Sequence, residues 1–459
     1  MFWDYLVGHE PDGSALSKDT GLAYDWEQSA DGLTWTFLIR EGVKFHDGTE
    51  ATAEDVKFSL ERAASPGSSA SDARNLKNWV DTVTVLDPYT VAVKTKVVIP
   101  LLPYELSTFS AVGAAIQPKA YIEKVGEAEF NANPISTGPY LIEEHLIGDH
   151  ITFKAISGEH FAVGVPKYER IIFKLVPEES SRIAMLKRSD VDVATVSLER
   201  ALELKDDGFP VWEKPGDRTY GVIFQQLWDE SPTQDIRVRE ALGLAINKEE
   251  ILTYLFKGKG MLQGSYPSTS ATLGHGENTP ALPYDPVRAK ELLAEAGYPD
   301  GFTLNLYATT LYPGHVEYNE ALASYWSAIG IDVKVLVMDY AGFRVKLQEG
   351  SLENPALRGH GYPSLAIVGV WLSWFNSDGI NTGLHDPEYD KLYDDLLSVK
   401  TAEEFYNAQR ILEEWLYNNR ITIGCFETSS FVVTSSTLTD WEATLAPYNF
   451  GVLASIYTK

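Results

Sequence analysis

The sequence contains only one cysteine, Cys425, among 459 residues. One thiol cannot form an intramolecular disulfide, and it cannot hold a zinc ion by itself. Cys425 lies in the alternating apolar segment ITIGCFE, so we expect a buried structural thiol. The scarcity of cysteine is compatible with an oxidising compartment.

Long hydrophobic runs are also absent. The longest near-apolar stretch, residues 365–372, is far shorter than the ~20 residues of a membrane-spanning helix, and we expect it to form a buried strand. The chain starts with Met1, Phe2, Trp3 and Asp4, without the basic region, apolar segment and cleavage site of a signal peptide. No export signal is therefore recognised in the chain as given.

Positive charge is scarce: 38 Lys and Arg stand against 65 Asp and Glu, and the net charge is −27. Nucleic-acid binding needs clustered basic side chains, so this balance argues against a nucleic-acid partner. It argues equally against docking on anionic lipid through the protein surface. A surface kept soluble by excess carboxylate explains the charge, and adaptation to a salty or hot habitat is the alternative.

Known catalytic motifs are missing from the sequence. It has no Gly-x-Ser-x-Gly elbow, no phosphate-binding glycine loop followed by Lys and Ser/Thr, and no His-Glu-x-x-His helix. Adjacent carboxylates diverge by about 100° on a helix and about 180° on a strand, so pairs of them cannot converge on one bond and should form solvated faces. These pairs are Glu143-Glu144, Glu178-Glu179, Asp206-Asp207, Glu249-Glu250, Asp394-Asp395 and Glu413-Glu414. We expect no catalytic residue, metal ion or cofactor.

Residues 22–63 carry the strongest local pattern. Residues 34–40 alternate, with Trp35, Phe37 and Ile39 on one face, which predicts a half-buried strand. Asp47-Gly48 then predicts a turn. Thr52 and Asp55 have the spacing of a capping box, which predicts a helix that continues to Arg62.

Strands and helices alternate along the rest of the chain. Thr82 to Lys94 has the pattern of a hairpin, and NPISTGPY, residues 133–140, marks a turn that leads into a strand. Asp235 and Asp285 each precede an amphipathic helical pattern, and alternating apolar strands follow in residues 302–306 and 331–337. This alternation predicts an α/β protein, and the length suggests roughly three domains.

Four of these segments resemble, in the same order, motifs of the extracytoplasmic solute-binding proteins, family 5. They are residues 22–63, NPISTGPY, DIRVREALGLAINKEEI (235–251) and YDPVRAKELLAEAGYPDGF (284–302). The resemblance runs from about Leu6 to the C-terminus. It implies a two-lobed periplasmic-binding-protein type II-like fold, with mixed sheets flanked by helices and an extra subdomain in lobe one.

The resemblance also implies domain boundaries. Residues 1–132 would form the extra subdomain, residues 133–226 with 441–459 the sheet domain of lobe one, and residues 227–440 lobe two. Relatives usually have a strand and loop before the first helix, which we expect here near Trp3. That strand would be missing, and one wall of the ligand cleft would be incomplete.

The best candidate for ligand binding is VGVWLSWFN, residues 368–376, followed by a loop. Trp371, Trp374 and Phe375 are too close together to share one core face, so at least one should project from the strand end. Relatives place a cleft-lining aromatic element here, and we include Asn376 in the predicted site. Aromatic walls favour a planar ligand by stacking.

Five further residues are weaker candidates. Tyr220 lies in the predicted crossing strand, Phe450 in a returning segment, and Trp3 and Tyr5 at the expected rim; for each, core packing is an equal alternative. His385 lies where nickel-chelate relatives have a ligand histidine.

The class of ligand stays open. Peptide-binding relatives usually carry an aspartate shortly after the cleft tryptophan, to pair with the peptide amino terminus, whereas here Trp374 stands three residues past Trp371. An ammonium buried without its partner costs about 3–5 kcal/mol. Either Asp378 substitutes, or the ligand is a sugar-like or opine-like solute without a free amine.

The resemblance implies the substrate-binding component of an ABC importer. Such a protein captures a small solute, here an oligopeptide or peptide-like molecule, between two lobes without changing it chemically. We expect a periplasmic or extracytoplasmic monomer, free or lipid-anchored in its full-length precursor, with an ABC permease as partner. The alternatives are an oligosaccharide- or opine-binding component, a nickel-chelate-binding component, a glycoside hydrolase, and a sensor or chaperone on the same scaffold.

Overall fold

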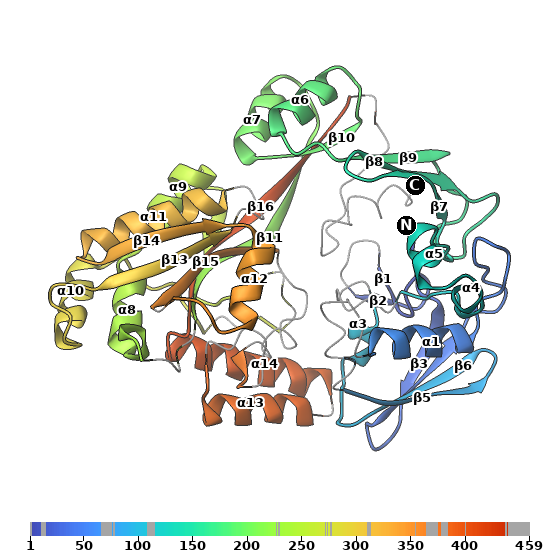
Figure 1. The fold of residues 1–459 in the computed structure, drawn as a ribbon, viewed down its shortest axis with the longest axis horizontal. Coiled ribbons are helices and arrows are strands. Elements are labelled where there is room, and N and C mark those ends of the chain that lie inside the picture. The colour runs from blue at the N-terminus through green and yellow to red at the C-terminus, as the bar shows by residue number, and fades with distance from the viewer. Residues whose placement is uncertain are drawn as a thin grey trace. The chain divides into compact units, whose positions relative to one another are not determined.

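The computed structural model describes residues 2–10, 15–65, 76, 79–107, 115–225, 227, 230–270, 272, 274–275, 278–309, 314–353, 355–363, 375–377, 384–399, 401–436 and 438. The chain forms two compact units (Figure 1). Unit 1 comprises residues 1–194, 397–402 and 434–459, and unit 2 comprises residues 195–396 and 403–433. The finer three-part division expected from the sequence stays a prediction.

A four-stranded antiparallel sheet in unit 1 has the order β3-β4-β6-β5 (Figure 1). Every second residue of β4 is buried, which confirms the predicted face of Trp35, Phe37 and Ile39. Helix α1 begins at the predicted capping box, where the Thr52 backbone N–H donates to Asp55 Oδ2 at 2.9 Å. The bounds are β3 (Ala23–Gln28), β4 (Thr34–Ile39), α1 (Ala53–Ala63), β5 (Val80–Asp87) and β6 (Thr90–Thr95).

A second antiparallel sheet in unit 1 has the order β7-β8-β9. As predicted, its first strand follows the Gly138-Pro139 turn, and Tyr140 and Phe153 pack against Phe2 in a small core. Its strands are β7 (Tyr140–Leu146), β8 (His150–Ala155) and β9 (Arg170–Lys174). The other elements of unit 1 are β1 (Gly8–His9), β2 (Leu16–Ser17), α3 (Leu102–Glu105), α4 (Lys119–Val125), α5 (Glu127–Ala132) and α6 (Glu179–Lys187).

The expected helix near Trp3 is wrong, because residues 2–9 are extended. Their backbone groups bond to other segments of unit 1 rather than to each other. The Gly138 N–H donates to Phe2 O at 3.2 Å, and the Leu22 N–H donates to Tyr5 O at 3.0 Å. These long-range bonds satisfy the backbone in a way that the local sequence pattern did not reveal.

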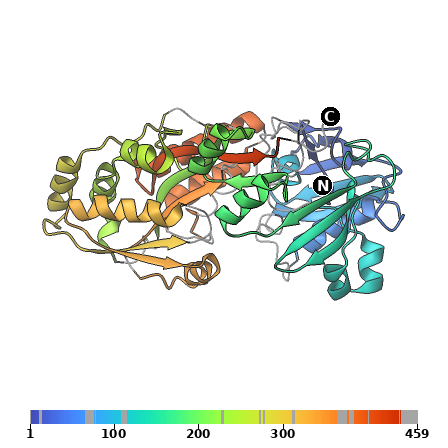
Figure 2. The same ribbon diagram turned by 90° about the horizontal axis from the view of Figure 1, so that it is seen from above.

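The larger sheet is mixed and has the order β10-β16-β11-β15-β13-β14, with β12 paired to β16. Strand β11 is antiparallel to both β15 and β16, whereas β13 is parallel to both β14 and β15. Figures 1 and 2 both show the long strands β11 and β16 running side by side. The strands are β10 (Val193–Val196), β11 (Val211–Gln225), β12 (Gly260–Leu262), β13 (Thr303–Thr309), β14 (Asp332–Met338), β15 (Ala356–Pro363) and β16 (Thr422–Thr434).

Helices of unit 2 begin where the sequence predicted caps. Asp235 Oδ1 accepts the N–H of Arg237 at 2.8 Å, and Asp285 Oδ1 accepts the N–H of Arg288 at 2.9 Å. The predicted burial of Cys425 is confirmed. The helices are α7 (Leu198–Asp206), η1 (Pro232–Gln234), α8 (Ile236–Leu244), α9 (Lys248–Phe256), α10 (Pro286–Glu295), α11 (His315–Ala328), α12 (Tyr340–Gln348), α13 (Pro387–Ser398) and α14 (Ala402–Asn418). Within the described ranges, no helix combines the length and apolar character needed to cross a membrane.

Candidate functional site

Phe375 packs against the first turn of α13, Asn376 follows Phe375 in the chain, and His385 lies two residues before the helix begins. The Phe375 side chain is 2% exposed, and its ring centroid lies 6.3 Å from that of Tyr389 in an edge-to-face arrangement. Ser377 forms two hydrogen bonds with Asp390, which follows Tyr389 on the helix. The Ser377 N–H donates to Asp390 Oδ1 at 2.8 Å, and the Ser377 hydroxyl donates to Asp390 Oδ2 at 2.6 Å. Residues 375–377 are therefore held on the beginning of α13.

The local sequence explains why α13 begins here. Asp386 Oδ1 accepts the backbone N–H of Glu388 at 2.8 Å and that of Tyr389 at 3.2 Å, as a helix cap does. Pro387 occupies the first helical position, where a missing N–H costs nothing. His385 precedes the cap and is exposed. The predicted residue thus lies at the edge of the same turn.

Helix α14 supports this turn. The buried Tyr389 ring lies 5.2 Å from the Trp415 ring, and burial raises the pKa of the Tyr389 phenol. Close by, the Glu413 side chain is buried, and burial raises the pKa of its carboxyl to about 7. The Ser265 hydroxyl donates to Glu413 Oε2 at 3.3 Å.

The interpretation of Glu413-Glu414 as a solvated pair is wrong for Glu413. A signal was present in the sequence: Phe405, Gln409, Leu412 and Leu416 form a buried stripe at spacings of four and three residues. Glu413 is four residues after Gln409 and three before Leu416, so it lies on the same face of the helix.

A second buried acid, Glu427 on β16, holds the segment 263–270 from the sheet side. Its Oε2 accepts the N–H of Ser270 at 2.8 Å, and its Oε1 accepts the Ser270 hydroxyl at 2.6 Å. The Gly424 N–H donates to Gly264 O at 3.1 Å, and a Cβ on Gly424 would overlap Ser265 O. The segment therefore lies directly on the strand.

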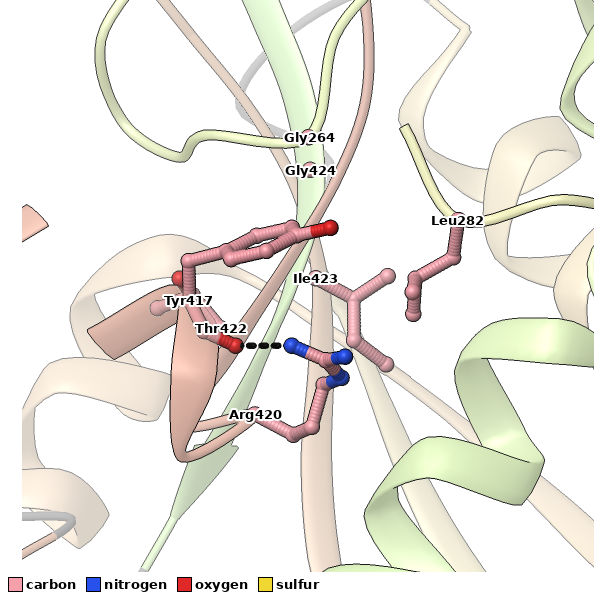
Figure 3. A pocket seen from close by; sticks show the side chains of 7 residues that line it. All are labelled: Gly264, Leu282, Tyr417, Arg420, Thr422, Ile423 and Gly424. Carbon is pink, nitrogen blue, oxygen red and sulfur yellow. Dashed lines mark hydrogen bonds between the residues drawn. The ribbon is translucent and has the colours of Figure 1, made fainter. Parts of the chain in front are cut away.

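A shallow pocket lies beside this segment and has no room for even one water molecule (Figure 3). Figure 3 shows the Arg420 guanidinium next to Tyr417, whose carbonyl accepts a hydrogen bond from Arg420 Nη1. Sites for small molecules usually measure about 300–1,000 Å³, so a pocket that cannot hold a water molecule is not the site of a peptide-sized solute. Its lining residues are Gly264, Leu282, Tyr417, Arg420, Thr422, Ile423 and Gly424.

Tyr220 lies in an aromatic cluster of unit 2. Its side chain is 2% exposed, with ring centroids 4.8 Å from Phe256 and 5.2 Å from Tyr318 and Phe426. Burial raises the pKa of its phenol to about 12. This position matches the core-packing alternative for Tyr220, and a ligand contact stays a prediction.

Trp3 and Tyr5 lie in the extended N-terminal segment of unit 1 and are both half-buried. Trp3 packs edge-to-face on Phe2 at 4.8 Å, and burial raises the pKa of Tyr5. Asp4, between them, is buried, and its Oδ2 lies 2.9 Å from His160 Nε2. Burial alone would raise the pKa of Asp4, but the hydrogen bond and the charge of His160, together with smaller contributions such as that of the Thr137 side chain, lower it below its usual value.

The other predicted site residues, Trp371, Trp374 and Phe450, lie outside the described residues, as does Asp378. In the part of the chain that the structure describes, no group of three or more His, Cys, Asp or Glu side chains could hold a metal ion.

Comparison with known proteins places the chain in a family. The model of "Bacterial extracellular solute-binding proteins, family 5 Middle" matches residues 19–380. The chain is 31% identical over 358 residues to the glutathione-binding protein GsiB of Salmonella paratyphi A, covering 76% of this chain and 66% of GsiB. It is 27% identical over 421 residues to the dipeptide-binding protein of Escherichia coli K12, covering 86% of this chain and 72% of the relative.

The chain spans just under two thirds of the length of the glutathione-binding relatives. Among solved structures, the periplasmic binding protein AgaA of A. tumefaciens R10, in complex with agropinic acid, matches with a TM-score of 0.84. That match has 23% identity and covers 100% of this chain and 92% of AgaA, and it shows the shared two-lobed binding-protein fold. The chain belongs to the bacterial extracellular solute-binding proteins, family 5.

Proposed function

We propose that this protein is the substrate-binding component of an ABC importer and captures a small peptide or peptide-like solute without changing it chemically. The observation that carries the proposal is the family match over residues 19–380. The relatives named for glutathione and for dipeptides support a peptide-like ligand. The protein would act outside the cytoplasm, free or lipid-anchored, as a monomer that meets a permease in the membrane.

The ligand would lie between the two lobes and stabilise their closed arrangement, which the permease would recognise. This is a shift between two populations, so the ligand must bind the closed form more tightly than the open form. We propose that Phe375, Asn376, His385, Trp371 and Trp374 contribute from lobe two, and Trp3 and Tyr5 from lobe one. Phe450 and Tyr220 complete the proposed site.

Three acids of unit 2 have serine partners in the structure. A glycosidase needs two carboxyl groups facing a cleft, one to protonate the leaving group and one as base or nucleophile. Asp390 is engaged by Ser377, Glu427 by Ser270, and Glu413 by Ser265. Each of these three acids therefore already has a structural partner.

A second candidate ligand is an opine-like or sugar-like solute. One observation favours it: Trp374 occupies the position where peptide-binding relatives usually carry the aspartate for an amino terminus. An aromatic side chain there favours a neutral or planar group. The proposed role as a transport component is the same for both ligand classes.

Binding of glutathione, a dipeptide panel and agropinic acid, measured by thermal shift and calorimetry, tests the proposal. A probe at one hundred times its Kd should stabilise the folded protein by about 2.7 kcal/mol. Mass spectrometry of the recovered probe should show an unchanged mass. A cleaved product would overturn the binding-only role, and no stabilisation by any probe would overturn these ligand classes.

A further inference from the structure

Both carboxylate oxygens of Asp390 on α13 accept hydrogen bonds from one residue, Ser377, which lies in the segment of the proposed site. One oxygen accepts the backbone N–H of Ser377 at 2.8 Å, and the other accepts the Ser377 hydroxyl at 2.6 Å. Both bonds are partly shielded from solvent. Hydrogen bonds to an ionised carboxylate are about twice as strong as those between neutral groups.

Tyr389, the helix residue before Asp390, fixes the other end of segment 375–377. Phe375 is buried against Tyr389, and Tyr389 is buried in turn against Trp415 of α14. Residues 375 and 377 are thus fixed to two consecutive helix residues, with the half-buried Asn376 between them. A backbone held on both sides of one residue has few conformations left.

The support itself is rigid, because α13 is capped at the point of contact. Asp386 accepts the N–H groups of Glu388 and Tyr389, and the Asp390 N–H donates to Asp386 O at 3.0 Å. A binding segment held on a capped helix can keep one geometry in the absence of ligand. Such preorganisation removes part of the entropy cost of binding.

We propose that Asp390 is a positioning residue for ligand binding: its carboxylate fixes Ser377, and through it the segment 375–377, in the geometry that the solute meets. The role rests on the proposed function, because it assigns this segment to the ligand site. Asp390 does not itself touch the ligand. A purely structural role would stabilise unit 2 without changing affinity.

The test compares Asp390→Ala, Asp390→Asn and Ser377→Ala with wild type. Asp394→Asn is the matched control, because it neutralises an exposed acid one turn later on the same helix. Hydrogen exchange of the peptide containing Ser377 reports the order of the segment, and calorimetry with glutathione and a Met-Leu dipeptide reports affinity.

For Asp390→Ala we expect faster exchange at Ser377 and a Kd weakened about tenfold, since two charge-assisted bonds are lost. Asp390→Asn keeps one acceptor oxygen, and Ser377→Ala keeps the backbone bond, so both should lie between wild type and Asp390→Ala. These milder variants preserve the test if Asp390→Ala fails to fold. The Asp394→Asn control should match wild type in both measurements.

Unchanged exchange at Ser377 in Asp390→Ala would overturn the proposal. Faster exchange with unchanged affinity would also overturn it and leave only a structural role. If wild type binds none of the probes in the full panel, the proposed ligand classes are wrong. The predicted effect of Asp390 on the Kd is then wrong as well. The exchange measurement would then still decide whether Asp390 orders the segment.

Discussion

Asp4 of unit 1 and Glu413 of unit 2 are both buried carboxylates, and they differ in their partners. Asp4 in unit 1 lies 2.9 Å from the His160 ring nitrogen, whereas Glu413 in unit 2 accepts from the Ser265 hydroxyl at 3.3 Å. Burial alone would raise the pKa of both acids, but at Asp4 the hydrogen bond and charge of His160, together with smaller contributions, lower it below its usual value. These two acids are both buried, and the direction of the pKa shift follows their partners: it is downward beside the His160 ring and upward beside neutral groups.

The largest effect should come from removing the partner of Asp4. His160→Ala leaves a buried carboxylate without its hydrogen-bonding ring, and we expect a loss of about 3–5 kcal/mol in the free energy of unfolding at pH 7. Urea denaturation followed by tryptophan fluorescence measures it. The double variant Asp4→Asn/His160→Ala is the control and should recover part of the loss. A loss below about 1 kcal/mol would show that water replaces the partner.

In unit 2 we expect that removing the charge of a buried acid stabilises the protein at basic pH. The rise of the Glu413 pKa from 4.5 to about 7 corresponds to at most about 3 kcal/mol. This contribution to stability is fully present below pH 4.5 and is lost as the pH rises through about 7. Glu413→Gln should therefore be more stable than wild type at pH 8 and lose that advantage below pH 4.5.

Unfolding of both proteins across this pH range measures the difference. Glu414→Gln is the matched control, since Glu414 is more exposed and adjacent in sequence. Equal pH profiles for wild type and Glu413→Gln would contradict the raised pKa.

The same acid-to-amide change should destabilise unit 1. Asp4→Asn keeps the size of the side chain but loses the charge that His160 favours, so we expect a loss of about 1.5–3 kcal/mol at pH 7. The lowered pKa of Asp4 means that its contribution is present above the usual value of 3.8 and disappears as the pH falls through the folded-state pKa. Wild type and Asp4→Asn should converge in acid. A gain in stability at pH 7 would remove the contrast between the two carboxylates.

The smallest effect should come from the cap that supports the proposed site. Asp386→Ala removes the acceptor for two backbone N–H groups of α13 and should cost about 1 kcal/mol. Thermal unfolding of the full chain measures this loss of stability. Asp386→Asn serves as a variant that retains a capping oxygen. An Asp386→Ala protein as stable as wild type would show that the Phe375–Tyr389 packing and the Ser377–Asp390 hydrogen bonds hold the turn without the cap.

Patterns that depend on near neighbours in the sequence predicted much of the fold. The alternation in residues 34–40, the capping box at Thr52 and the caps at Asp235 and Asp285 were all confirmed. Each is decided by residues within one or two turns of the chain. The candidate site stays a prediction. The structure adds that Phe375 packs against Tyr389 of α13, a contact that the sequence pattern did not reveal, and Trp371, Trp374 and Phe450 lie outside the described residues.

What the sequence by itself determined is the α/β class, the order of the elements and their caps, because hydrophobic period and capping chemistry act over a few residues. What only the tertiary structure decided is which polar groups meet. Asp4 and His160 are 156 residues apart, and Ser265 and Glu413 are 148 apart. Burial and charge pairing depend on such distant contacts, so the ionisation of these acids became visible only when the chain was folded.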